Sequence, residues 1–150
     1  MSQNSERSIS QAVIVALDGP SGVGKSTVAR ELARRLGVPY LDTGAMYRAV
    51  GLLAVRNGIS APLDADDEPA LTALAEEHTI ELAGDGGCLV VSVDGEDVSE
   101  AIRTPECALM ASAVSAVSGV RRALVPVQRR IGRRRGCVME GRDIGSVVFP

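Results

Sequence analysis

The spacing of hydrophobic and polar positions changes along the chain, and this change predicts a mixed α/β fold. Residues 12–17 are apolar at every position, which is typical of a parallel strand covered on both faces. From Val28 to Leu36 apolar residues recur at helical spacing, and Gly37 follows as a left-handed cap. Residues 38–41 then predict a short second strand. These lengths and this order predict a parallel sheet with helices on its faces.

Residues 60–99 depart from this pattern. After an acidic, proline-containing stretch and a short predicted helix, apolar residues alternate along two segments, 79–82 and 88–93. Asp94-Gly95, which follows them, is a strong signal for a hairpin turn. We therefore expect a small antiparallel sheet as an insert in one domain that comprises residues 1–150.

The last third of the chain returns to helices and one strand. Two helices are expected, the second of which begins near Ser118 and contains Pro126, which should kink it. The run Arg133–Arg135 after that helix is predicted to be a solvated loop. Residues 136–140 predict a third strand, which ends in Glu140. An acidic residue in this place can order the water ligands of Mg²⁺ in nucleotide-binding proteins.

Composition narrows the classes of function. A chain of 150 residues with 45% hydrophobic residues can form one domain with a core. No apolar run approaches the ~20 residues of a membrane span, and the polar first ten residues contain no signal for export, so we expect a cytoplasmic protein. Cys88, Cys107 and Cys137 have no metal-type spacing and are interpreted as reduced thiols.

The charge balance argues against nucleic acid as the main partner. The formal net charge is −3, and aromatic residues make up only 2% of the chain, too few for a base-stacking surface. The arginine run at 133–135 leaves an RNA-binding patch as the alternative hypothesis. His78, the only histidine, is interpreted as a solvated residue at a helix end, without a catalytic partner.

A glycine-rich turn between the first strand and the first helix carries the clearest chemistry. Residues 19–26 fit G-x-x-x-x-G-K-[ST] at all four fixed positions. Its glycines let successive backbone N–H groups surround a phosphate at the positive end of the helix. An ordinary glycine-rich turn is the alternative, but strand, loop, lysine, serine and helix all occur in order. The residues expected to bind ATP are Gly19, Pro20, Ser21, Gly22, Val23, Gly24, Lys25, Ser26 and Thr27.

Two of these residues have specific expected roles. Lys25 can reach the β- and γ-phosphates, and the Ser26 hydroxyl can ligate Mg²⁺. A third charged residue, Arg48, follows the second strand, at the side of a parallel sheet where ligands bind. Its guanidinium could hold a second phosphate in bidentate fashion, whereas a solvated surface arginine is the simpler alternative.

Three sequence strings resemble bacterial cytidylate kinase. They are L-D-T-G-A-M-Y-R at 41–48, G-E-D-V-S-x-x-I-R at 95–103 and E-G-R-D-I-G-S-V-V-F-P at 140–150. Ser112, the residues around Arg121 and the Gln128-Arg129 pair also resemble that family. The resemblance extends from about Val13 to Pro150 and implies a P-loop kinase core with a small β insert in its region for binding nucleoside monophosphates.

The resemblance implies transfer of the γ-phosphoryl group of ATP to CMP or dCMP, with Mg²⁺. Arg48 and Arg142 would bind the CMP phosphate and, together with Lys25, would be the catalytic residues. Ser112, Arg121 and Asp143 would contact the cytosine edge, and Thr43 would lie near the nucleotide phosphate. The alternative for Arg121 and Asp143 is a salt bridge within a helix. The family acts on free nucleotides, so no membrane or nucleic-acid partner is expected, and the chain is expected to be a monomer.

The chain departs from the family after residue 150. The family continues with two more core strands and a lid that carries charged residues, so this chain is expected to be incomplete at its C-terminal end. The first strand, central in the family's sheet, would then lie at an edge. Outside this family, the sequence leaves open another P-loop small-molecule kinase of the shikimate type, and a nucleotide-binding protein or fragment without catalysis.

Overall fold

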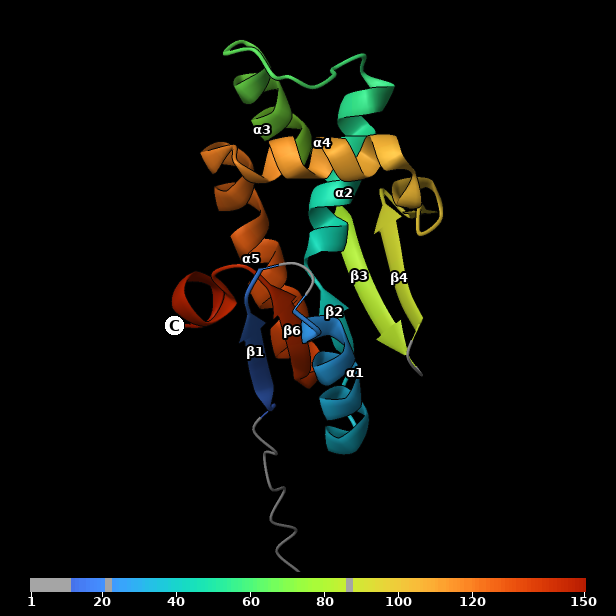
Figure 1. Ribbon diagram of the computed structural model, residues 1–150, viewed down its shortest axis with the longest axis vertical. Coiled ribbons are helices and arrows are strands. Elements are labelled where there is room, and N and C mark those ends of the chain that lie inside the picture. The colour runs from blue at the N-terminus through green and yellow to red at the C-terminus, as the bar shows by residue number, and fades with distance from the viewer. Residues whose placement is uncertain (1–11, 21–22, 86–87) are drawn as a thin grey trace, which may run out of the picture.

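The computed structural model describes residues 12–20, 23–85 and 88–150, and its elements follow the chain in the order that Figure 1 shows. The strands and helices are β1 Ile14–Asp18, α1 Lys25–Leu36, β2 Tyr40–Asp42, α2 Gly44–Arg56, α3 Asp67–Glu77, β3 Ile80–Asp85, β4 Cys88–Val93, β5 Glu96–Asp97, α4 Pro105–Ser115, α5 Ser118–Arg135 and β6 Cys137–Gly141. A 3₁₀ turn, η1 Ala101–Arg103, precedes α4, and a π-helical turn, η2 Ile144–Val148, follows β6.

The predicted parallel sheet is present, with the strand order β1-β6-β2. Leu17 of β1 and Asp42 of β2 both lie beside Glu140 of β6, so the carboxyl ends of the three strands meet at one edge. Within the described ranges β1 pairs only with β6, which confirms the expected edge position. The loops after β1, β2 and β6 therefore converge at this edge. In open α/β sheets, ligands bind beyond the carboxyl ends of the strands.

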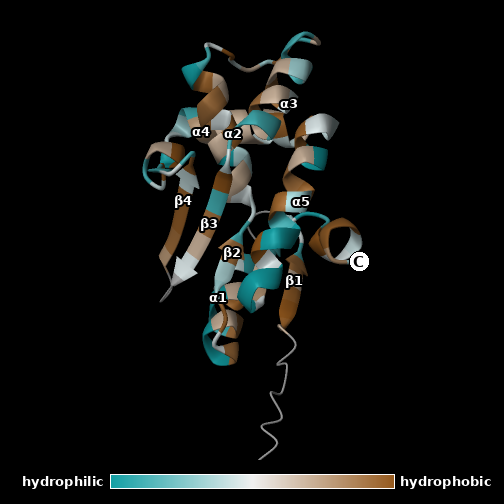
Figure 2. Ribbon diagram, turned by 180° about the vertical axis from the view of Figure 1, so that it is seen from behind, coloured by the Kyte–Doolittle hydropathy of each residue, from teal (hydrophilic) through white to brown (hydrophobic). Residues whose placement is uncertain are grey.

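Helices cover both faces of this sheet. In Figures 1 and 2 α1 lies over one face, and α5 lies behind the other. Alternation along β6 matches these two layers, because Val138 packs with Ala29 and Ala33 of α1, whereas Cys137 and Met139 belong to the larger core on the α5 side. Cys137, Val138 and Met139 are all buried, as expected for a strand with helices on both faces of its sheet.

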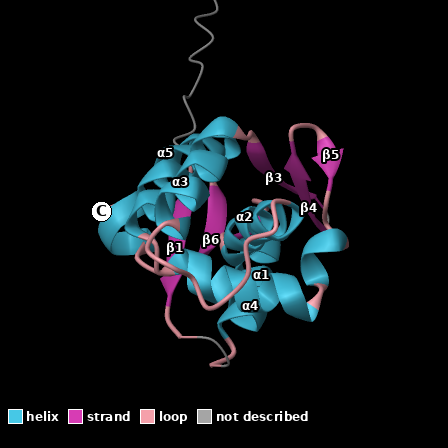
Figure 3. Ribbon diagram, turned by 90° about the horizontal axis from the view of Figure 1, so that it is seen from above, coloured by secondary structure: helices cyan, strands magenta, loops and turns pink. Residues whose placement is uncertain are grey.

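The helical half of the molecule packs around α2. Figure 3 shows α2 and α4 next to each other beneath the loops at the top of Figure 1. Gly51 of α2 allows the two helices to approach closely, since a Cβ atom at this position would lie 3.1 Å from Met110 Cβ and 3.3 Å from the Cys107 carbonyl oxygen of α4. In the described part of the chain, no single helix is long and apolar enough to cross a membrane; α4 and α5 satisfy both conditions only together, across a 99° bend.

The expected antiparallel sheet is also present and consists of β3, β4 and β5 in that order. Asp94 and Gly95 join its last two strands with positive φ angles of 51° and 83°, the conformation of a type I′ hairpin turn. The glycine-rich stretch at 84–87, between the two alternating segments, lies partly outside the described residues.

Two local predictions were wrong. Arg133–Arg135 is not a loop, because α5 continues to Arg135 and the positive φ of Gly136 then turns the chain into β6. Arginine is a good helix former, and the run extends an existing helix. His78 lies at the end of α3, as predicted, but the expectation that it has no partner was wrong, since its Nδ1 lies 2.6 Å from Asp94 Oδ2. The two residues are 16 positions apart and meet only because the small sheet folds back on itself. No local sequence pattern therefore predicts this pair.

The three cysteines are free thiols that differ in burial, which leads to a testable difference in reactivity. Cys88 is exposed, whereas Cys107 and Cys137 are buried, and burial raises the pKa of the Cys137 thiol to about 11. At pH 8 the native chain should therefore show one fast-reacting thiol with Ellman's reagent, and all three thiols after denaturation. Three fast thiols in the native chain would contradict the buried positions of the other two.

Candidate active site

A cavity of about 570 Å³ lies at the carboxyl edge of the parallel sheet and brings most predicted site residues together. Its wall contains residues of the glycine-rich turn and the start of α1, namely Gly19, Pro20, Gly24, Lys25, Ser26 and Thr27, and residues from other elements, namely Thr43, Arg48, Ser112, Arg121 and Arg142. Val23 does not line it, and Ser21 and Gly22 lie outside the described residues. Asp143 lines an adjoining hollow instead.

The glycine-rich turn has the backbone geometry that a phosphate site needs. Gly24 adopts a left-handed conformation with φ 81° and caps α1, which begins at Lys25. The first N–H groups of this helix have no partner within the helix and point toward the loop. Lys25 Nζ donates a hydrogen bond of 2.5 Å to the Gly19 carbonyl oxygen, so the ammonium group already lies over the turn.

Glu140 connects this turn with the third strand. Its carboxylate is buried, with 7% of the residue exposed, and lies at the end of β6 as the sequence predicted. Oε1 accepts a hydrogen bond of 3.0 Å from the Ser26 hydroxyl and lies 3.9 Å from Lys25 Nζ, while the Tyr40 hydroxyl donates to Oε2. Burial and this hydrogen bond to Glu140 raise the pKa of Tyr40, which remains a neutral donor.

The residues around Ser26 fit a magnesium ion. Ser26 supplies a hydroxyl oxygen, and Glu140 supplies a buried carboxylate oxygen 3.0 Å from it. Hard oxygen donors of this kind, completed by phosphate oxygens and water, are the ligands that Mg²⁺ prefers. The described residues contain no group of three or more His, Cys, Asp or Glu side chains that could hold a metal on its own. The donor set therefore suits an ion that arrives with a phosphate.

Asp42 and Arg48 provide opposite charges at the start of α2. Asp42 Oδ1 accepts a hydrogen bond of 2.9 Å from the Gly44 N–H, so it satisfies one of the donors at the beginning of this helix. Burial raises the pKa of Asp42, and the positive charges of Arg48 and Lys25 oppose that change. Arg48 lines the cavity from the helix that the sequence predicted.

Thr43 has a structural bond that the sequence did not indicate. Its backbone N–H and its hydroxyl both donate to the Glu140 carbonyl oxygen, at 3.0 and 2.9 Å. The side chain is buried and lines the cavity, but its hydroxyl hydrogen is engaged with β6. Thr43 therefore fixes the start of α2 against the strand that carries Glu140.

Arg121 and Asp143 form an ion pair between α5 and the turn after β6. The structure thus contains the salt bridge that the sequence left as the alternative, although it connects two elements and not two turns of one helix. Both side chains are partly exposed and line a hollow of about 270 Å³ beside the main cavity, together with Tyr47, Gln128 and Arg142. Tyr47, Arg121 and Arg142 line both hollows.

Four residues at this site were not among those predicted from the sequence as ligand-binding. The sequence marked Glu140 only as an acidic residue at the end of a strand. Tyr47 lies in the string 41–48 that resembles cytidylate kinase, but no role could be assigned to it from the sequence. Tyr40 and Asp18 had no usable signal, because their partners, Glu140 and the backbone of residues 144–145, are 100 or more positions away. Burial raises the pKa of Tyr47, so its hydroxyl stays protonated in the cavity wall.

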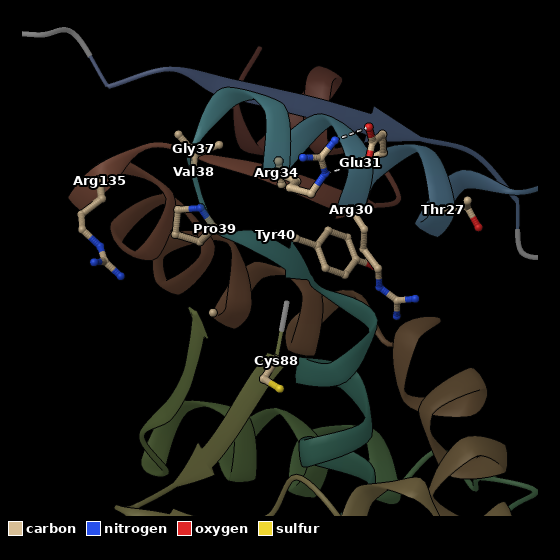
Figure 4. A pocket seen from close by; sticks show the side chains of 12 residues that line it. Thr27, Arg30, Glu31, Arg34, Gly37, Val38, Pro39, Tyr40, Cys88 and Arg135 are labelled. Carbon is tan, nitrogen blue, oxygen red and sulfur yellow. Dashed lines mark hydrogen bonds and ion pairs between the residues drawn. The ribbon is translucent and has the colours of Figure 1, made fainter. Parts of the chain in front are cut away.

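A larger hollow, of about 860 Å³, lies elsewhere (Figure 4). It separates the outer face of α1 from the small sheet, and Thr27 is the only predicted site residue in its wall. In Figure 4 Arg30 lies over the ring of Tyr40, with the guanidinium carbon 5.4 Å from the ring centre, while Arg34 pairs with Glu31. It therefore offers arginine and aromatic groups but no phosphate-binding turn, and size alone does not identify the site.

Comparison with known proteins identifies the relatives of this chain. The profile of the family described as Cytidylate kinase matches residues 15–150. A cytidylate kinase of Solibacter usitatus (strain Ellin6076) is 55% identical over 138 residues, which are 92% of this chain and 56% of that protein. A cytidylate kinase of Syntrophotalea carbinolica (strain DSM 2380 / NBRC 103641 / GraBd1) is 51% identical over 142 residues, covering 95% and 59% of the two sequences.

A third relative combines two activities in its name. It is the bifunctional pantoate ligase/cytidylate kinase of Synechococcus sp. (strain JA-2-3B'a(2-13)), which is 50% identical over 140 residues, 91% of this chain and 25% of that protein. The chain spans less than two thirds of the length of the curated cytidylate kinases it matches.

Proposed function

The chain belongs to the cytidylate kinase family, and from this premise we propose that it transfers the γ-phosphoryl group of ATP to CMP or dCMP, giving ADP and CDP or dCDP. One observation carries the proposal: a single cavity is lined both by the phosphate-binding turn and by Arg48, Arg142 and Arg121. A site for one nucleotide alone would need only the phosphate-binding turn. A phosphoryl transfer between two nucleotides needs both the turn and the arginines.

The ATP side of the cavity would align and neutralise the transferred group. The transition state of phosphoryl transfer is loose, so a protein contributes mainly positioning and electrostatic stabilisation. Backbone N–H groups at the start of α1 would hold phosphate oxygens, and Lys25 would leave the Gly19 carbonyl to contact the β- and γ-phosphates. Ser26 and, through water, Glu140 would hold Mg²⁺, which neutralises charge on the phosphate oxygens.

The opposite side would hold CMP. Arg48 and Arg142 would grip its phosphate, and Ser112, Arg121 and Asp143 would contact the cytosine edge. The ion pair between Arg121 and Asp143 supports this assignment, since it keeps a donor and an acceptor side by side where a base with both kinds of group would bind. An analogue such as UMP, with a keto oxygen in place of the amine, would leave one of these groups unsatisfied.

The test is ADP release from MgATP by this chain with CMP, dCMP, UMP, AMP and shikimate as acceptors. We expect turnover with CMP and dCMP at least about 10²-fold above that with UMP, because a polar group that the bound base covers and leaves without a partner costs a few kcal/mol. Preference for shikimate would indicate another small-molecule kinase. Equal binding of CMP and UMP without transfer would indicate a nucleotide-binding protein or fragment.

We propose further that the chain acts in the cytoplasm as a monomer on free nucleotides, without a nucleic-acid partner. The net charge of −3 and the sparse aromatic residues support this view. RNA binding that falls steeply with salt and survives Lys25→Ala would contradict it, and light scattering on the purified chain would test the oligomeric state.

A further inference from the structure

Asp18 connects two loops that lie far apart in the sequence. It is the last residue of β1 and directly precedes Gly19 of the phosphate-binding turn. Its Oδ1 accepts a hydrogen bond of 2.7 Å from the Ile144 N–H, and its Oδ2 accepts one of 2.9 Å from the Gly145 N–H. Both carboxylate oxygens are thus used to hold the segment that follows Arg142 and Asp143.

The backbone of that segment is shaped to present these two N–H groups. Asp143 adopts a left-handed conformation with φ 56°, and η2 begins at the next residue. The first N–H groups of a helical turn have no partner within it, and a negative charge is favoured at this end. The Asp18 carboxylate supplies both the acceptors and the charge.

The other end of η2 is held independently. Arg129 of α5 donates from Nε to the Val148 carbonyl oxygen and from Nη2 to that of Val147, both at 2.8 Å. This contact ties η2 to α5 but not to the phosphate-binding turn. The sheet register ends at the pair of Asp18 and Gly141, so beyond this point only Asp18 links the two loops through the bonds described.

We propose that Asp18 is a positioning residue, which holds Arg142 and Asp143 in register with the phosphate-binding turn so that the acceptor phosphate is aligned with ATP. The proposal rests on the proposed function, since it assigns the acceptor to this turn. Displacement of a substrate by about 1 Å can cost 10²-fold in rate, so a direct link between the two binding loops has a clear use. Asp18 acts through the backbone of residues 144–145 and not through contact with substrate.

The test compares Asp18→Asn with Asp94→Asn in the full chain. An Asn side chain has one acceptor oxygen and turns an NH₂ donor toward the second N–H. For Asp18→Asn we expect CMP to bind about tenfold more weakly, MgATP to bind within about twofold of wild type, and the Ile144 and Gly145 amides to exchange about tenfold faster. Asp94 also accepts a backbone N–H, from Thr79 at 2.8 Å, but in the small sheet, so its variant should leave both affinities unchanged.

A second variant keeps the test valid if Asp18→Asn does not fold. Asp18→Glu retains the charge and both acceptors but adds a methylene, and it should weaken CMP binding about threefold with MgATP binding unchanged. Unchanged CMP affinity in both variants, or equal losses for CMP and MgATP, would overturn the proposal. If the wild-type chain bound no CMP, the proposed function would fail, whereas amide exchange of residues 144–145 in Asp18→Asn would still decide whether Asp18 holds this turn.

Discussion

Replacing Lys25 by alanine should lower the turnover of CMP phosphorylation by about 10²–10³-fold, the scale for loss of one preorganised electrostatic partner. Lys25 is the only lysine in the sequence, and its ammonium group lies over the phosphate-binding turn, 3.9 Å from the buried Glu140 carboxylate. No neighbouring amine can replace it. The measurement is ADP release from MgATP at saturating CMP.

The matched control is Arg34→Ala, which removes a cation from the same helix. Arg34 is 71% exposed, pairs with Glu31 and lies away from the cavity, so its loss should change turnover by less than about twofold. Turnover of Lys25→Ala within about threefold of wild type would refute the role of this lysine.

The single lysine also allows a direct observation of its environment. Reductive methylation with ¹³C-formaldehyde keeps the charge and labels one side chain and the α-amino group. The signal of Lys25 should shift when MgATP is added and should stay in place with CMP alone, since CMP is assigned to the opposite side of the cavity. A Lys25 signal that ignores MgATP would contradict the predicted phosphate contact.

Replacing Gly136 by alanine should lower the free energy of unfolding by at least about 3 kcal/mol, the second large effect we expect. Gly136 turns the chain from α5 into β6 with φ 75° and ψ 166°, a region that is essentially restricted to glycine. A Cβ atom there would lie 2.4 Å from the Val13 carbonyl oxygen, which accepts the 2.9 Å hydrogen bond from the Cys137 N–H. The clash therefore falls on backbone at the start of the β1–β6 pair.

Gly58→Ala is the control for a glycine with positive φ and no clash. Gly58 also has φ 75°, but no atom lies within 4 Å of the position of its Cβ. Its replacement should lower the free energy of unfolding by only about 1 kcal/mol. Urea denaturation of both variants gives the comparison, and equal losses would contradict the larger cost predicted at Gly136.

Elements with local signals could be predicted from the sequence alone. The phosphate-binding turn, its strand and its helix follow from residues within one window of the chain, and so does the Asp94-Gly95 hairpin. Apolar periodicity likewise predicted the parallel sheet and the antiparallel insert. The strings that resemble cytidylate kinase selected one family among the many that use a P-loop, and the family comparison agrees.

The way in which these elements meet could not be predicted from local sequence and is seen only in the folded chain. The insertion of β6 between β1 and β2 brings Glu140 to Ser26, 114 positions away, and brings residues 144–145 to Asp18. It also decided that Thr43 bonds to β6 and that Arg121 pairs with Asp143. Such contacts depend on strand order and register, which arise from packing over the whole chain, and no short stretch of sequence encodes them.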